Sequence, residues 1–161
     1  MAAGKSVRIT LSFKRESDGL PVVFKSDGKR FESQLTVKFQ QDETYRVEIT
    51  VRPPLPVDSL RIQEEKIDLE QITKFIDPNA LSYGGLWKTT GMGQTEKNKR
   101  TFLKLSVSLW KSGTFTTSLQ TKFYPHADVQ HARWGDKLNF VEYECIIGSD
   151  STITTTKQQI A

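Results

Sequence analysis

Apolar residues recur at every second position in one short segment of this chain after another. The alternation is clearest in Val7–Phe13, Leu35–Phe39, Tyr45–Val51 and Leu103–Leu109. Successive side chains of an extended chain point to opposite faces, so each segment predicts a strand with one buried face. About ten such segments follow one another with turn residues between them. We therefore expect an all-β fold, an antiparallel β-sandwich or barrel of about ten strands.

Glycine and proline mark the ends of these predicted strands. Asp27-Gly28 tolerates the positive φ angles that tight hairpin turns require, so it predicts a β-hairpin. The successive prolines of Arg52–Pro56 cannot donate to a β-ladder and end the strand before them. From Asp58 to Ile76 the apolar spacing fits either strands or one short helix.

Length and composition indicate one domain. The 161 residues are enough to bury a core without disulfides or metal ions. We assign the β-domain to residues 1–150, and we expect the polar, Thr-rich segment from Ser151 to Ala161 to be a flexible tail. One cysteine leaves no internal disulfide, and no apolar run is long enough to cross a bilayer, so we expect a soluble cytoplasmic protein.

The charge of the chain is modestly basic. Its formal net charge is +4, and its basic residues are scattered except for a cluster between Lys97 and Lys104. Such a cluster is typical of a solvated loop, and no RNA-binding aromatic signature or zinc-finger spacing accompanies it. We expect no nucleic-acid partner.

Side chains with catalytic or metal-binding chemistry are few and poorly placed. His126, Asp128, His131 and Cys145 are residue types that ligate metals, but both histidines fall in a loop without the spacing that fixes ligand geometry. The Ser-x-x-Lys string that begins at Ser26 resembles penicillin-binding enzymes, yet it lies at the predicted hairpin tip. Because no nucleophile is paired with a base, we expect no enzymatic activity, no metal and no cofactor.

The segment Tyr124–Gly135 lies between two strand-like runs and is the best candidate for binding a partner. Pro125 interrupts strand pairing, and Trp134 lies beside a permissive glycine. Large rings in loops anchor partners at low entropic cost, whereas the alternative is that Trp134 folds back to close one end of the sandwich. The candidate partner-binding residues are Tyr124, His131, Arg133 and Trp134.

Several short strings of this sequence resemble one known family. They are Gly113-Thr114-Phe115, Lys122-Phe123-Tyr124, His131 with Trp134-Gly135, Val141-Glu142-Tyr143-Glu144-Cys145, Asp27-Gly28-Lys29-Arg30-Phe31 and Tyr45-Arg46-Val47-Glu48. Through them the chain is similar, from about Gly19 to Cys145, to the cannabinoid receptor-interacting protein 1 family. The segment after Ile146 lacks the Trp-containing end and the Phe-Leu terminus of that family.

The resemblance implies a β-fold similar to the Rho GDP-dissociation inhibitors, which hold a lipid tail between two sheets. It also implies an adaptor that binds the cytoplasmic C-terminal tail of a cannabinoid-type G-protein-coupled receptor, modulates its signalling and is recruited with it to the inner face of the plasma membrane. An acyl or prenyl chain could enter the apolar interior, with Thr117 and Thr121 expected to face away from it. The candidate lipid-lining residues are Leu105, Val107, Phe115, Leu119, Phe123 and Tyr143.

Three alternatives stay open at this point. A packed core would show the same apolar alternation as a lipid pocket. A general carrier of lipidated proteins, without receptor specificity, is the alternative function among binding proteins. An enzyme is the alternative of another class, and the missing nucleophile–base pair disfavours it.

Overall fold

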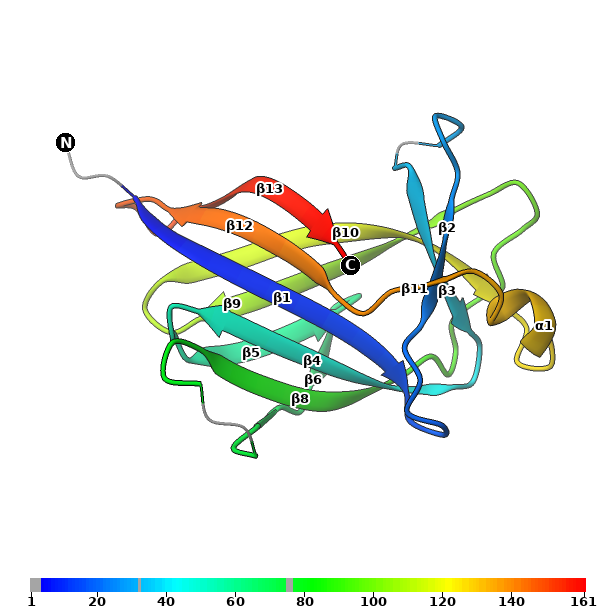
Figure 1. Ribbon diagram of the computed structural model, residues 1–161, viewed down its shortest axis with the longest axis horizontal. Coiled ribbons are helices and arrows are strands. Elements are labelled where there is room, and N and C mark those ends of the chain that lie inside the picture. Colours follow the sequence, from blue (N-terminus) through cyan, green and yellow to red (C-terminus); the bar gives the residue numbers. More distant parts are fainter. Residues whose placement is uncertain (1–3, 32, 75–76) are drawn as a thin grey trace.

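Two β-sheets pack face to face in the computed structural model, which describes residues 4–31, 33–74 and 77–161 (Figure 1). The strands of the first sheet are β1 (Lys5–Arg15), β4 (Thr44–Arg52), β7 (Glu70–Gln71), β8 (Leu81–Lys88), β12 (Val141–Ile147) and β13 (Ile153–Ile160). Their order across the sheet is β13-β12-β1-β4-β8-β7, and all neighbouring strands are antiparallel. β1 therefore lies near the middle of this sheet.

The second sheet contains seven strands and one parallel pair. The strands are β2 (Val23–Ser26), β3 (Leu35–Gln40), β5 (Val57–Ile62), β6 (Glu65–Ile67), β9 (Thr101–Leu109), β10 (Gly113–Tyr124) and β11 (Asp136–Lys137). Their order is β11-β2-β3-β10-β9-β5-β6, and only β3 and β10 run parallel. The two sheets stay separate, so the predicted all-β sandwich is confirmed. The fold is an open sandwich and not a closed barrel.

Alternate residues of the long strands fill the space between the sheets, as their period predicts. One end of this core is aromatic, near the C-terminal ends of β3 and β10, where most of the ring pairs meet edge to face. The cluster consists of Phe13, Phe39, Tyr45, Trp87 and Phe123. The centroids of Phe39 and Trp87 lie 5.1 Å apart, a favourable distance for such pairs. Trp87 is 1% exposed within this cluster.

The segment whose pattern fitted either strands or a helix forms strands. β5 and β6 pair as a hairpin, and the two residues between them, Gln63 and Glu64, have φ angles of 48° and 69°. Positive φ at both central residues is typical of the turns that suit the twist of a hairpin. Ile76, where that prediction ended, lies outside the described residues. In the described part of the chain the only helix is α1 (Val129–Ala132), which the sequence did not predict.

The predicted hairpin at Asp27-Gly28 is confirmed, although its loop is longer than a tight turn. β2 and β3 are antiparallel, and the residues between them run from Asp27 to Gln34. The backbone N–H of Asp27 donates to the Gln34 carbonyl at 2.6 Å, and Gly28 has a φ of +61°. This φ explains the glycine, because residues with a Cβ rarely adopt it.

The expectation of a flexible tail after Ser151 is wrong for most of that segment. Ile153–Ile160 forms β13, which pairs with β12 along its length from Ile147↔Ile153 to Val141↔Ile160. Its threonines favour extended structure. Because β13 is an edge strand whose residues between Ile153 and Ile160 are all exposed, its sequence carries no alternation by which to recognise it.

Candidate partner-binding site

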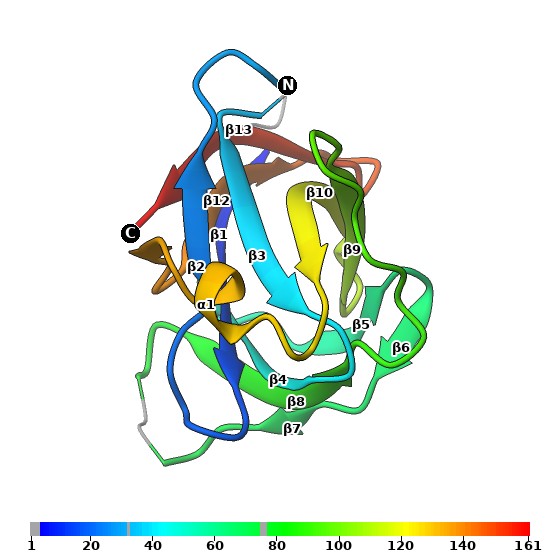
Figure 2. The ribbon, with the colours of Figure 1, turned by 90° about the vertical axis from the view of Figure 1, so that its right-hand side faces the viewer.

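The segment after β10 crosses the outer face of β3 before it rejoins the second sheet at β11 (Figure 2). Its single helical turn, α1, begins after Asp128, whose carboxylate accepts a hydrogen bond from the backbone N–H of His131 at 3.2 Å. The same carboxylate lies 3.0 Å from Nδ1 of His131. An N-cap of this kind satisfies one of the donors that a helix start leaves free.

Lys38 of β3 holds this segment in place. Its side chain is almost fully buried, and Nζ donates to the carbonyl oxygens of His131 at 3.0 Å and Trp134 at 2.7 Å. Nζ also lies 5.5 Å from the ring centroid of Tyr124 and 5.2 Å from that of Trp134, within the range of cation–π attraction. One buried lysine therefore brings together three of the four candidate partner-binding residues.

Burial and nearby positive charge shift the titration of Lys38. Burial lowers its pKa first, and repulsion from Lys25 and Lys122 lowers it further. The two carbonyl oxygens offset part of the cost of burying the ammonium group, because hydrogen bonds to charged groups are the stronger ones.

Arg133, the fourth candidate residue, is bound mainly to its own protein. Its Nε atom donates to Oε1 of Gln40 at 3.0 Å, and its guanidinium lies 3.7 Å from the carboxylate of Asp18 and 4.0 Å from that of Glu43. Gln40 in turn donates through Nε2 to the His126 carbonyl at 2.9 Å. These contacts indicate that Arg133 fixes the end of the segment to β3.

Trp134 points away from the core. It is 71% exposed, so the alternative in which it closes the end of the sandwich is wrong. The backbone of the next residue, Gly135, has a φ of +145° and runs so close to β2 that a Cβ would lie 2.7 Å from the Phe24 carbonyl oxygen. Glycine at this position allows the backbone of residue 135 to pack directly against β2, while the ring of Trp134 stays in solvent.

The two residues that organise this site, Lys38 and Gln40, carry no local sequence signal of that role. Lys38 and Gln40 alternate with Val37 and Phe39, so the period assigns them to the solvent face of β3. They are buried because a segment some ninety positions later in the chain covers that face.

The six candidate lipid-lining residues are all buried, and one of them lines a pocket. Leu119 borders a cavity of about 300 Å³ that opens between β3 and β10 on one side and β12 and β13 on the other. Its other apolar lining residues are Phe24, Leu35, Val37, Leu138, Val141 and Ile160. Phe115 packs instead on Tyr143, with centroids 5.0 Å apart, and Phe123 stacks on Phe39. Leu105 and Val107 are 0% exposed in the shared core.

Thr117 and Thr121 do not face away from the apolar layer, so that expectation is wrong. They lie two residues from Leu119, and residues two apart on a strand share a face. Thr121 is fully buried, and its hydroxyl donates to the Thr101 carbonyl at 2.6 Å. A buried threonine with its hydroxyl satisfied is compatible with an apolar core.

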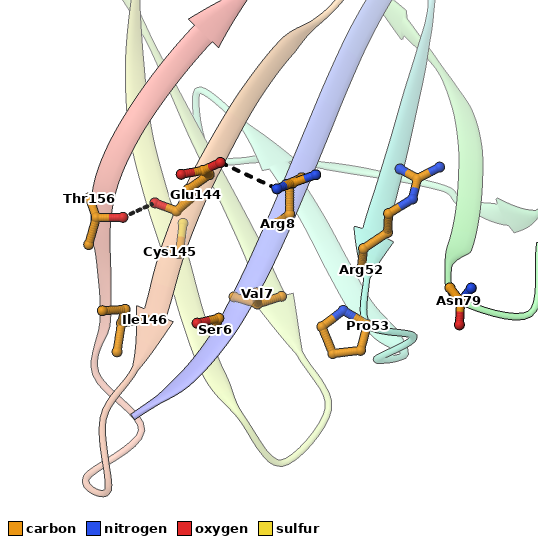
Figure 3. A pocket seen from close by; sticks show the side chains of 10 residues that line it. All are labelled: Ser6, Val7, Arg8, Arg52, Pro53, Asn79, Glu144, Cys145, Ile146 and Thr156. Carbon is orange, nitrogen blue, oxygen red and sulfur yellow. Dashed lines mark hydrogen bonds and ion pairs between the residues drawn. The ribbon is translucent and has the colours of Figure 1, made fainter. Parts of the chain in front are cut away.

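A wider hollow of about 530 Å³ lies on the outer face of the first sheet. Figure 3 shows Arg8 between Glu144 and Arg52 in this hollow. The guanidinium of Arg8 lies 3.3 Å from the Glu144 carboxylate, and that of Arg52 lies 3.3 Å from Asp77, so both charges are already paired. Burial raises the pKa of the Cys145 thiol, which makes it a poor nucleophile here.

Within residues 4–31, 33–74 and 77–161, no three His, Cys, Asp or Glu side chains are grouped to hold a metal ion. The same residues include no helix with the length and apolar character needed to span a bilayer.

Comparison with known proteins identifies the family. The family model described as CB1 cannabinoid receptor-interacting protein 1 matches residues 3–160. The chain belongs to this family. Similar curated relatives include the CB1 cannabinoid receptor-interacting protein 1 of Rattus norvegicus and that of Homo sapiens, each 31% identical over 140 residues. These alignments cover 86% of this chain and 85% of each relative, so they extend well beyond the candidate site.

Proposed function

We propose that this protein is a non-enzymatic regulator that binds the cytoplasmic C-terminal tail of a cannabinoid-type G-protein-coupled receptor and modulates its signalling. Its relatives are named for their interaction with the CB1 cannabinoid receptor. In this proposal the protein works in the cytoplasm and reaches the inner face of the plasma membrane through the receptor.

The observation that carries the proposal is the exposed ring of Trp134 on a fixed backbone. The ring is 71% exposed, while the carbonyl of the same residue is bound by the buried Lys38. A pre-ordered aromatic side chain loses little entropy when a partner covers it, which is typical of residues that dominate binding energy. Tyr124 and His131 contact the same Lys38 side chain and would form the rest of the binding surface.

Titration calorimetry of a receptor-tail peptide against the wild type and the Trp134→Ala variant tests the proposal. We expect the substitution to weaken binding by about 2 kcal/mol, as loss of an aromatic anchor does. Retention of full affinity by the folded variant would remove Trp134 from the proposed binding surface.

A second proposal is that the cavity beside Leu119 accepts the end of an acyl or prenyl chain. The cavity has a volume of about 300 Å³, is lined by both sheets and lies at their open edge. This volume is near the lower limit for small-molecule pockets, and each buried methylene would contribute about 0.8 kcal/mol. The packed core behind Leu119 would not have to move.

Matched tail peptides with and without a palmitoyl group test this second proposal, below their aggregation concentration. We expect tighter binding of the lipidated peptide, and loss of that advantage in Leu119→Trp, which fills the cavity. Leu86→Trp adds the same ring at an exposed position of the first sheet and is the control. Equal affinity for the two peptides would reject the lipid site. A lipid advantage that persists with a scrambled tail would favour a general carrier of lipidated proteins over a receptor-specific one.

A further inference from the structure

Three lysines lie together on the outer face of the second sheet, beside Trp134. They are Lys25 of β2, Lys38 of β3 and Lys122 of β10, and we call them, with the rings of Tyr124 and Trp134, the basic face. Lys38 and Lys122 are direct partners in the parallel pairing of β3 with β10. Like charges placed opposite each other on neighbouring strands are destabilising. Burial lowers the pKa of both residues first; repulsion from Lys25 and Lys122 lowers that of Lys38 further, and repulsion from Arg100 and Lys25 lowers that of Lys122 further.

The nearby carboxylates are already paired, and Asp27 shares its charge between Arg100 and Lys25. Asp27 is 2% exposed and pairs with Arg100 at 3.1 Å, and its distance to Nζ of Lys25 is 3.9 Å. Asp128 is bound to His131. Among the described residues, no carboxylate lies within ion-pair distance of Lys38 or Lys122. The basic face thus keeps an excess of positive charge.

Sites where a protein breaks a local rule of stability without internal compensation are often functional. Here the broken rule is the opposed pair of Lys38 and Lys122, and an anion beside the more exposed Lys122 would offset their repulsion. The flanking rings of Tyr124 and Trp134 offer apolar contact to the same ligand, with Nζ of Lys122 5.0 Å from the Tyr124 centroid.

We infer that the basic face binds an acidic peptide segment, whose Asp or Glu side chains lie over Lys25 and Lys122 while a neighbouring side chain packs on Trp134. This inference rests on the proposed function and specifies the chemistry of the receptor-tail segment that would bind there. A peptide fits better than a membrane surface, because clusters that bind anionic lipids typically present about four to eight basic residues, and Lys38 is almost fully buried.

The test uses two peptide pairs and one pair of variants. The first pair is the receptor-tail peptide and a copy in which every Asp and Glu is replaced by Asn and Gln. The second pair is a short synthetic probe of alternating Glu and Ser around one Phe, and the same probe with Gln. Binding is measured at low and high salt to the wild type, to the double variant Lys25→Gln with Lys122→Gln, and to Lys157→Gln. Lys157 is exposed on β13 of the opposite sheet and serves as the control.

We expect the wild type and Lys157→Gln to prefer each acidic peptide about tenfold over its amide copy, and this preference to shrink with salt. The double variant should lose most of it. Equal affinity for acidic and amide peptides, or an undiminished preference in the double variant, overturns the inference. Lysine-dependent binding to phosphatidylserine vesicles in place of the peptides would assign the face to a membrane and also overturns it.

The outcomes separate this inference from the proposed function. A tail peptide that binds equally well as its amide copy leaves receptor-tail binding standing and rejects the acidic ligand. A tail peptide that fails to bind, while the synthetic acidic probe binds through Lys25 and Lys122, rejects the receptor tail and supports an acidic partner.

Discussion

Nζ of Lys38 donates to the carbonyl oxygen of Trp134 at 2.7 Å and also lies 5.2 Å from the centroid of the same residue's indole ring. One buried ammonium thus fixes the backbone of a residue whose side chain is largely in solvent. An exposed ring would otherwise move with its loop. The pair explains how a loop segment can present an ordered binding surface.

Replacement of Lys38 by methionine should loosen this segment without emptying the space it fills. Lys38→Met removes the donor to the carbonyls of His131 and Trp134. Because hydrogen bonds to charged groups are worth about 1.5–3 kcal/mol, we expect the free energy of unfolding to fall by about that amount and amide exchange in residues 129–135 to accelerate. Lys122→Met, which is more exposed, is the control. Unchanged exchange in Lys38→Met would contradict the assigned role.

Two buried tyrosines should respond differently to loss of their hydroxyls. The Tyr45 hydroxyl accepts a hydrogen bond from the Gln40 backbone N–H at 2.7 Å, whereas that of Tyr143 has no hydrogen-bond partner among the described residues. Tyr45→Phe leaves a buried donor unsatisfied, so we expect it to cost about 1–3 kcal/mol. Tyr143→Phe should be neutral or slightly stabilising. Denaturant unfolding measures both, and equal costs would disprove the distinction.

Tyr45 should also contribute to alkaline unfolding. Burial raises its pKa from 10.0 to about 12. Between these values the unfolded chain releases this proton and the folded protein keeps it, so the stability due to Tyr45 is present below pH 10 and is lost as pH rises toward 12. We expect unfolding free energy to fall less steeply with pH in Tyr45→Phe than in the wild type. Parallel pH profiles would contradict this assignment.

The buried ion pair of Asp27 with Arg100 should contribute far more to stability than the exposed pair of Asp77 with Arg52. The two side chains are 2% and 5% exposed, whereas Asp77 and Arg52 are 45% and 43% exposed at a similar distance. Removal of one partner from a buried pair costs about 3–5 kcal/mol, so we expect this loss in Asp27→Asn. Asp77→Asn should cost less than about 1 kcal/mol. Similar costs in chemical unfolding would show that the Asp27 pair is effectively solvated.

The pKa of Asp27 also predicts how the stability of the protein changes at acid pH. Burial alone would raise the pKa of Asp27, but hydrogen bonds from Arg100 and Thr36, together with the positive charge of Arg100, lower it below 3.8. The stabilisation is therefore complete above pH 3.8 and is lost as pH falls through the lower pKa of the folded state. The Asp27→Asn variant should lack this part of the acid transition, and an identical acid transition would refute its origin in Asp27.

The alternating pattern predicted the strands whose one face is buried and the other wet, such as β1, β4 and β9. It missed β13, because an edge strand that is exposed on both faces shows no alternation of apolar and polar residues. It also missed α1, a single turn whose formation depends on the Asp128 cap and on contacts with β3.

The candidate site was only partly predictable for a related reason. Trp134 could be singled out as a large ring in a loop, but its exposure depends on the long-range contact of its backbone with Lys38. The alternating pattern of β3 predicted that Lys38 is exposed to solvent. Such a pattern depends only on neighbouring residues, so it cannot indicate that a segment far along the chain covers the strand. The pocket at Leu119 likewise depends on how the sheets diverge at their edge, which strand periodicity does not determine.

The central claim is that Trp134 anchors a receptor tail, and a comparison of two tryptophans tests it most directly. Trp110 is 51% exposed, and Nζ of Lys111 lies 4.5 Å from its ring centroid, but it lies at the opposite end of β10 from α1. Titration calorimetry with one receptor-tail peptide should show that Trp134→Ala weakens binding by about 2 kcal/mol while Trp110→Ala leaves it unchanged. Full affinity in a folded Trp134→Ala variant, or an equal loss in both variants, would contradict the account.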